Sequence, residues 1–261
     1  MHDPTIGLSP FAGRSPPSRF RRQRAGRQTL HSHIRIENMH IEPDLVSPEK
    51  MLIAYGTAAA AAGYTAKLAW DSIREQGPLS LVARSVVGTA AVFAFFELLP
   101  HHAVGVSEVH LILGSTLLLV LGAAPAAIGL ALGLLLQGLF FAPFDLPQYF
   151  ANVTTLLVPL FAIKLVADRI IRPDTPYVDL RYSQALALSA TYQGGVVLWV
   201  GFWALYGQGL GAENITAVAS FGAAYMLVVL AEPLIDLAIL AGAKLVRGLG
   251  RTGLVTRRLY A

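Results

Sequence analysis

Outside the first 38 positions, four residues have the type and spacing to do chemistry: His40, His101, His102 and His110. The chain contains no cysteine. Imidazole nitrogens without thiols suit divalent metals of intermediate softness, such as nickel, cobalt, copper or zinc. One hypothesis is therefore a site for such a metal. The alternative is that the loop histidines are merely polar and that His110 is a residue of a membrane interface.

The elements that must position these histidines follow from the composition. The chain has 261 residues, of which 54 % are apolar and 14 % are charged, and its mean hydropathy is +0.55. Soluble domains carry about 25 % charged residues, and disorder requires low hydrophobicity with high net charge, so neither class fits the body of the chain. The lack of cysteine excludes a disulfide scaffold. The apolar residues form blocks of about 20, the length at which a helix crosses a bilayer.

We therefore expect an all-α fold, a polytopic membrane bundle of about seven transmembrane helices. The apolar stretch 109–142 is too long for one span of about 20 residues, so a turn at Gly122–Pro125 should divide it. Pro233 should kink the last span, because proline removes a backbone donor and clashes with the turn before it. The expected spans lie at about 51–70, 79–99, two within 109–142, 149–171, 184–206 and 215–246.

The placement of lysine and arginine sets the expected orientation. Lys67 and Arg74 flank the connection after the first span, and Arg169, Arg172 and Arg181 lie between the fifth and the sixth. The alternate connections, PHHAVGVSE, PFDLPQ and GQGLGAEN, contain neither residue type. Because basic residues mark the cytoplasmic side, we expect the N-terminus outside and the C-terminus in the cytoplasm. The protein would be a multi-pass component of the plasma (inner) membrane, with all four histidines at its external side.

The basic charge of the chain is concentrated in one short segment. The net charge of +4 and the pI near 9.5 would alone suggest an anionic partner such as nucleic acid. However, residues 1–38 hold seven arginines and two acidic residues, whereas the rest of the chain holds 13 Lys or Arg and 14 Asp or Glu. We therefore expect no nucleic-acid partner for the body of the chain.

Three regions are expected from this distribution. Residues 1–38 form an Arg- and Pro-rich disordered extension, 39–246 a seven-span metal-binding membrane domain, and 247–261 a basic cytoplasmic tail. An arginine-rich head outside the cell breaks the charge rule, so we interpret the extension as a mis-assigned start. A nucleic-acid-binding or lipid-binding arm is the alternative.

Three segments carry recognisable motifs: 39–48 is MHIEPDLVSP, 105–114 is GVSEVHLILG, and 136–153 runs from LQGL to ANV. In this order they resemble the opening Met-His-Ile, the Gly-Thr-Ser-x-His-Leu-x-Gly and the Gln-Ala-Leu-Leu … Gly-Ala-Asn-Val segments of the CbiM/NikM family. Members of that family are the substrate-capturing membrane components of cobalt and nickel energy-coupling-factor transporters. The resemblance covers Met39 to about Val246.

The resemblance implies that the N-terminal residue itself holds the metal. Carried onto this sequence, the ligands are the amine of Met39, the amide nitrogen and imidazole of His40, and His110. Such tetragonal nitrogen ligation suits Ni(II) and Cu(II). It requires a free amine at Met39, and hence translation that starts there or a cleavage just before it.

Other polar residues have lesser expected roles near this site. Asn152 and Gln137 would orient the binding loop through hydrogen bonds. His101 and His102 have no role in the family, so they either collect metal at the mouth of the site or do nothing. Glu108 departs from the family pattern, which has small or polar residues before the histidine.

Three acidic residues, Glu97, Glu232 and Asp236, lie within or near apolar spans. A charge there is costly and usually faces the interior of the bundle or an aqueous cavity. We interpret these residues as structural hydrogen-bonding groups rather than as metal ligands.

The chain lacks a nucleotide-binding motif, which bears on the source of energy for transport and on the partners of the protein. The chain has no Gly-x-x-x-x-Gly-Lys-Ser/Thr sequence, and we expect no enzyme activity and no permanently bound cofactor. The resemblance implies Ni2+ or Co2+ as the transported substrate. It also implies two ATPase subunits, a coupling transmembrane subunit and a small accessory membrane subunit, all in the lipid bilayer or on it.

A repeat of alanines in the first span suggests where a partner docks. The repeat consists of Ala54, Ala58, Ala62 and Ala66. Small side chains four residues apart share one helix face and let another helix approach closely. The resemblance implies docking on the coupling subunit, whereas the alternative is packing within the chain's own bundle.

A second functional class remains open, a seven-span membrane sensor or receptor for a small ligand. A retinal protein needs a buried lysine near the middle of its last span. Lys244 falls near the cytoplasmic end of that span instead.

Overall fold

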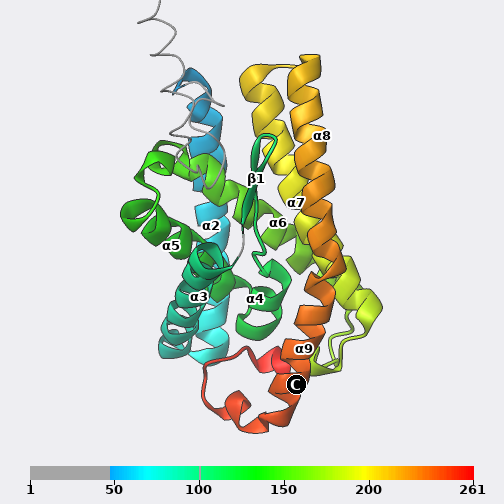
Figure 1. The fold of residues 1–261 in the computed structure, drawn as a ribbon. Coiled ribbons are helices and arrows are strands. Elements are labelled where there is room, and N and C mark those ends of the chain that lie inside the picture. The colour runs from blue at the N-terminus through cyan, green and yellow to red at the C-terminus, as the bar shows by residue number, and fades with distance from the viewer. Residues whose placement is uncertain (1–47, 100) are drawn as a thin grey trace, which may run out of the picture. The chain divides into compact units, whose positions relative to one another are not determined.

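The computed structural model describes residues 48–99 and 101–261, and this part of the chain is mostly helical (Figure 1). The expected helical fold is therefore confirmed. The α-helices are α2 (Met51–Gln76), α3 (Pro78–Leu98), α4 (Gly114–Leu121), α5 (Ala123–Phe140), α6 (Tyr149–Ile170), α7 (Tyr182–Gln208), α8 (Ala212–Met226) and α9 (Glu232–Leu245).

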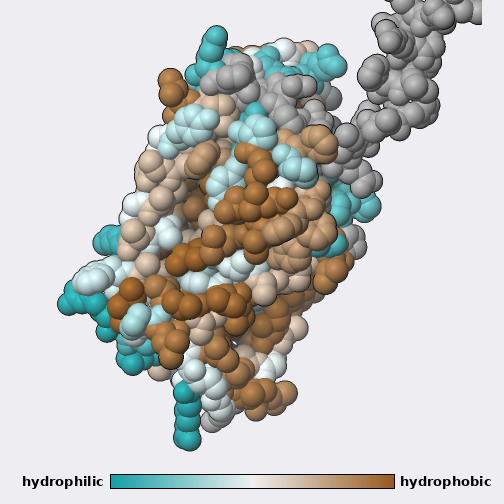
Figure 2. Space-filling model, turned by 90° about the vertical axis from the view of Figure 1, so that its left-hand side faces the viewer, coloured by the Kyte–Doolittle hydropathy of each residue, from teal (hydrophilic) through white to brown (hydrophobic). Residues whose placement is uncertain are grey.

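Five helical segments of the described residues are long and apolar enough to cross a membrane, which confirms a polytopic membrane protein. They are Pro78–Leu98, Ala123–Phe140, Pro143–Ile170, Tyr182–Gln208 and Ala212–Leu245. Helix α2 has 26 residues and thus sufficient length, but its many Ala, Gly and Thr residues make it less apolar than these five. Figure 2 shows apolar side chains covering the middle of the displayed face, with hydrophilic side chains toward its ends.

The segment 109–121, expected as the first half of a divided helical stretch, differs from the expectation. Strands β1 (His102–Val104) and β2 (Ser107–Val109) form an antiparallel hairpin, and residues 110–113, which are neither helix nor strand, lead from it to α4. Helix α4 has only eight residues, about 12 Å of rise, whereas the hydrocarbon core is about 30 Å thick. This segment therefore does not cross a membrane on its own.

A glycine at the tip of the hairpin explains the difference. Gly105 has φ +63°, and a Cβ at this position would lie 2.1 Å from the carbonyl oxygen of Ala217 in α8. Only glycine combines this backbone conformation with so close an approach. The turn therefore packs directly on the α8 backbone, which continuous helix through this segment would prevent.

Glycines also set the closest helix packing. A Cβ on Gly129 of α5 would lie 2.7 Å from the carbonyl carbon of Gly88 in α3, and one on Gly133 would lie 2.6 Å from the side chain of Val92. Between transmembrane helices, where lipid is as apolar as leucine, such small residues let backbones approach and pack. Helices α3 and α5 are thereby held as a closely packed pair.

The last expected span is interrupted near Pro233, as predicted. Helix α8 ends at Met226, a 3₁₀ turn covers Leu227–Leu230, and α9 begins at Glu232. Figure 1 shows α9 continuing the direction of α8. The break lies before Pro233 because a proline ring clashes with the carbonyl four residues earlier and supplies no N–H to it.

One end of the bundle gathers the connections that were expected to be cytoplasmic. The Gln76 amide donates to the carbonyl of Val255, and the Arg258 guanidinium donates to the carbonyl of Ile171 at the end of α6. Lys244 of α9 pairs with Asp179 at 2.5 Å. The α2–α3 connection, the α6–α7 connection and the C-terminal residues thus meet at the same end.

A buried arginine ties this end together. Arg84 of α3 is 2 % exposed and donates to the carbonyl of Leu121, the last residue of α4, and to the Ser72 hydroxyl of α2, both at 2.7 Å. The last carbonyls of a helix have no intrahelical partner. Arg84 therefore satisfies the end of α4 and links three helices.

We predict that Arg84→Gln lowers the free energy of unfolding by about 2–3 kcal/mol, because it leaves a buried carbonyl and a buried hydroxyl without their charged donor. Thermal unfolding of the full chain in detergent measures the change. Arg74→Gln is the control, since Arg74 is an exposed residue of α2. Equal melting temperatures for the two variants would contradict the role given to Arg84.

Candidate metal site

The buried imidazole of His110 is the centre of the candidate site. His110 directly follows β2, two residues after Glu108 in the chain. Both residues are buried, and Oε2 of Glu108 lies 3.3 Å from Nε2 of His110. The ring of Phe96, from the end of α3, meets the imidazole edge-on with centroids 5.5 Å apart.

A pocket opens beside His110 between the hairpin and the helices α3, α6, α7 and α8. Besides Glu108 and His110, its lining includes Asn152 of α6, Val196 of α7 and Tyr225 of α8. The left-handed backbone of Leu113, with φ +55°, lies between this stretch and α4. A non-glycine residue in this conformation costs about 1–3 kcal/mol and is typical of functional sites.

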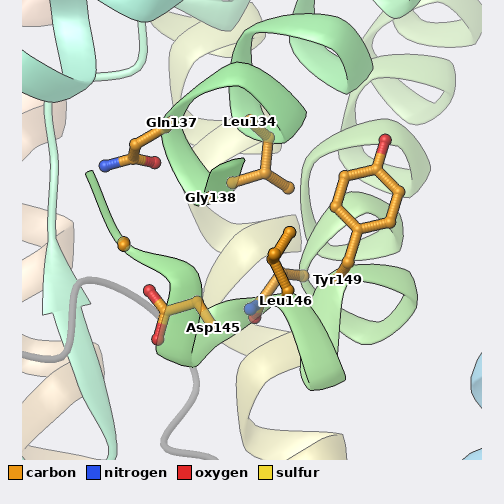
Figure 3. Close-up of a pocket in the computed structure, with 8 residues that line it drawn as sticks. Leu134, Gln137, Gly138, Asp145, Leu146 and Tyr149 are labelled. Atoms are coloured by element: carbon orange, nitrogen blue, oxygen red, sulfur yellow. The ribbon is translucent and has the colours of Figure 1, made fainter. Parts of the chain in front are cut away.

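A second cavity adjoins the first through Asn152. Its lining includes Gln137 of α5 and Asp145 of the α5–α6 connection, and Figure 3 shows their polar groups on one side of it. Gln137 and Asn152 were both expected near the site, and the structure places them around this one cavity. Asn152 is shared by both cavities, so it connects the Gln137 side to the His110 side.

Sequence reasoning missed Glu108 and Asp145 as site residues. Both are buried, and each lines one of the two cavities. Glu108 was noted only as a departure from the family pattern. A signal for Asp145 was available, because it is the one acidic residue of the short connection PFDLPQ, which contains no basic residue.

The other expected ligands lie at different distances from this centre. The ring of His101 stacks on that of His110, with centroids 5.5 Å apart and an interplanar angle of 27°. His102 is exposed on β1 and pairs with Val109 rather than reaching His110. Met39 and His40 lie outside the described residues, as does the extension 1–38. Within residues 48–99 and 101–261, no group of three or more His, Asp or Glu could hold a metal ion.

The four alanines of α2 do not share one open face. Ala54 and Ala58 are buried in the chain's own bundle, whereas Ala62 and Ala66 are exposed. Close packing within the bundle therefore accounts for the first half of the repeat, and docking of a partner remains a prediction for the second half.

Fold and site together define a helical, multi-pass membrane protein with a buried, histidine-lined pocket between its helices. The family model for the cobalt uptake substrate-specific transmembrane region, CbiM, matches residues 40–247. The chain therefore belongs to the CbiM family, as its motifs indicated, and is a membrane component of cobalt uptake. Comparison with curated proteins and with solved structures gave no match.

Proposed function

We propose that this chain is the substrate-binding integral membrane component of an energy-coupling-factor ABC transporter for Co2+ or Ni2+, with His110 as a ligand of the transported ion. The observation that carries the proposal is a buried imidazole that is oriented by a buried carboxylate. A loop histidine that served only as a polar surface residue would be exposed to solvent. His110 is instead 5 % exposed and enclosed by Phe96, Glu108 and His101.

Glu108 selects the nitrogen of His110 that faces the metal. A neutral imidazole has one N–H and one lone pair. Because Oε2 of Glu108 lies 3.3 Å from Nε2 of His110, an ion-pair distance, we assign the N–H to Nε2 and the lone pair to Nδ1 as part of this proposal. A carboxylate that accepts from the outer nitrogen fixes the tautomer and raises the basicity of a metal-binding histidine. Nδ1 is thus the proposed ligand atom.

The remaining ligands are proposed from the motif at 39–48. The amine of Met39 and the amide nitrogen and imidazole of His40 would complete a nitrogen set with His110. Tetragonal nitrogen ligation suits Ni(II), and by the Irving–Williams order it would bind Cu(II) more tightly still. Gln137 and Asn152 are proposed to orient this set through hydrogen bonds from the adjoining cavity.

The proposed orientation places the His110 pocket on the external side. The α2–α3 connection, the α6–α7 connection and the C-terminal residues share the opposite end, and this end, together with the helix segments next to it, carries most of the Lys and Arg of the described residues. The positive-inside rule makes that end cytoplasmic. Lys50 is at the external end, where its ammonium group is satisfied by the carbonyls of Tyr206 and Gly207.

The proposed partners are two ATPase subunits, a coupling transmembrane subunit and a small accessory membrane subunit. The chain carries no phosphate-binding motif, so ATP hydrolysis must occur on another chain. The exposed small residues of α2, Ala62 and Ala66, are the part of the alanine repeat that is open to a docking helix. A retinal-type sensor is not favoured, because Lys244 is on the surface and paired with Asp179.

The decisive variant is His110→Ala in cells that express the complete transporter. We predict that cobalt and nickel accumulation falls at least about tenfold, because a direct ligand is lost and even an outer-shell partner accounts for about 10–100-fold in affinity. His102→Ala is the matched control, since His102 is exposed. Accumulation by His110→Ala equal to that of the unmodified chain would refute the proposal.

The role of Glu108 has its own test. Glu108→Ala should raise the Kd for Co2+ by about 10–100-fold, because the imidazole loses the group that fixes its tautomer and ring orientation. Calorimetric titration of the purified full chain measures the Kd. Glu213→Ala, at an exposed position of α8, should leave it unchanged. A Kd unaffected in Glu108→Ala would show that the carboxylate does not position His110.

A further inference from the structure

Two carboxyl groups that do not line the His110 pocket lie in the interior of the bundle. Glu232 and Asp236 are separated by one turn of α9, so their side chains share a face. They are 0 % and 1 % exposed. Helices α4 and α7 cover this face and supply the hydroxyl and amide groups that contact it.

Each carboxyl group has one oxygen committed to donors and one without a partner. The Ser189 hydroxyl and the Gln193 amide donate to Oε2 of Glu232 at 2.5 and 2.7 Å. The Thr116 hydroxyl donates to Oδ1 of Asp236. Oε1 of Glu232 and Oδ2 of Asp236 are buried and have no hydrogen-bond partner among the described residues.

A buried hydroxyl between the two carboxyl groups indicates that something is held there. Ser115 of α4 is 0 % exposed, and its hydroxyl approaches both Glu232 and Asp236. Its oxygen nevertheless has no partner with hydrogen-bond geometry among the described residues. A hydroxyl can accept from one acid and donate to the other. It is therefore placed to complete a hydrogen-bonded chain once one of the two acids carries a proton.

Among the described residues, the two carboxyl groups have no basic partner, so a cation is needed to neutralise them. Two ionised carboxylates in the interior of a membrane protein are costly unless they are neutralised. In the described part of the chain, no Lys, Arg or His side chain forms an ion pair or hydrogen bond with either group. The other titratable groups beside Glu232 are the phenols of Tyr192 on α7 and Tyr225 on α8, and a phenol carries no positive charge.

The geometry favours a proton over a metal ion. A metal ion would need the lone pairs of the surrounding oxygens at distances of about 2.0–2.6 Å. Here the hydroxyls of Ser189 and Thr116 and the amide of Gln193 direct their hydrogens at the carboxyl oxygens instead. These donors stabilise one residual negative charge, and a single proton removes the other.

We propose that Glu232, Asp236 and Ser115 form an interior proton-binding site that holds one proton between the two carboxyl groups. The proton comes from water: a hydronium ion and a carboxylate give a carboxylic acid and a water molecule. Ser115 accepts from the protonated acid and donates to the other carboxylate. The site is separate from the proposed metal ligands and does not depend on them.

Infrared spectroscopy of the purified full chain tests this site directly. At neutral pH the chain should show the carbonyl stretching band of a protonated carboxylic acid, shifted in D2O. Glu232→Gln and Asp236→Asn should each remove or displace this band, whereas Glu213→Gln, at an exposed position, should not. Absence of the band from the unmodified chain, or its persistence unchanged in both interior variants, would overturn the proposal.

Two further measurements keep the test decisive if an interior variant fails to fold. Ser115→Ala keeps a good helix former in α4 and should shift the band, because one acid loses its hydrogen-bond partner. Addition of NaCl or CoCl2 to the unmodified chain should leave the band unchanged. Its loss on addition of either salt would show that a metal ion displaces the proton, and would contradict the inference that this site favours a proton over a metal ion.

Discussion

Polar side chains of this protein must find their partners inside the bundle, because the core of a bilayer offers no water to satisfy them. In the described residues, buried charged groups occur at three levels: Arg84 at one end, Glu232 and Asp236 in the middle, and Glu108, His110 and Asp145 toward the other end. Each level joins elements that are distant in sequence. The fold is therefore held by matched polar groups as well as by apolar packing, and the functional proposals concern two of these three levels.

Close packing at two glycines positions the polar groups of two of these levels. Gly105 brings the hairpin onto the backbone of α8, and Gly114 lies so close to Tyr192 that a Cβ would be 2.3 Å from its ring. The contact of Gly105 with α8 holds β2, and with it Glu108, at the His110 pocket. The contact of Gly114 with Tyr192 fixes the start of α4, and with it Ser115 and Thr116, against α7. A larger side chain at either glycine would displace a polar group from its partners.

The sequence predicted the helical, membrane-spanning class because apolar blocks of bilayer length leave few alternatives. It also predicted the break at Pro233, whose cause is local. The hairpin was missed, since its stability comes from the contact of Gly105 with α8, which no local pattern reveals. His110 was found from residue type and motif. Glu108 was not, because its role depends on a side-chain contact with His110 that the sequence pattern does not reveal.

The central claim, that His110 binds the transported ion, is tested most directly by cobalt X-ray absorption spectroscopy. The full chain would be loaded with a stoichiometric amount of Co2+ and compared with His110→Ala under the same conditions. The account predicts nitrogen ligands with the outer-shell scattering of imidazole, and a clear decrease of that scattering in the variant. Identical spectra, or a cobalt environment without imidazole in the unmodified chain, would contradict it.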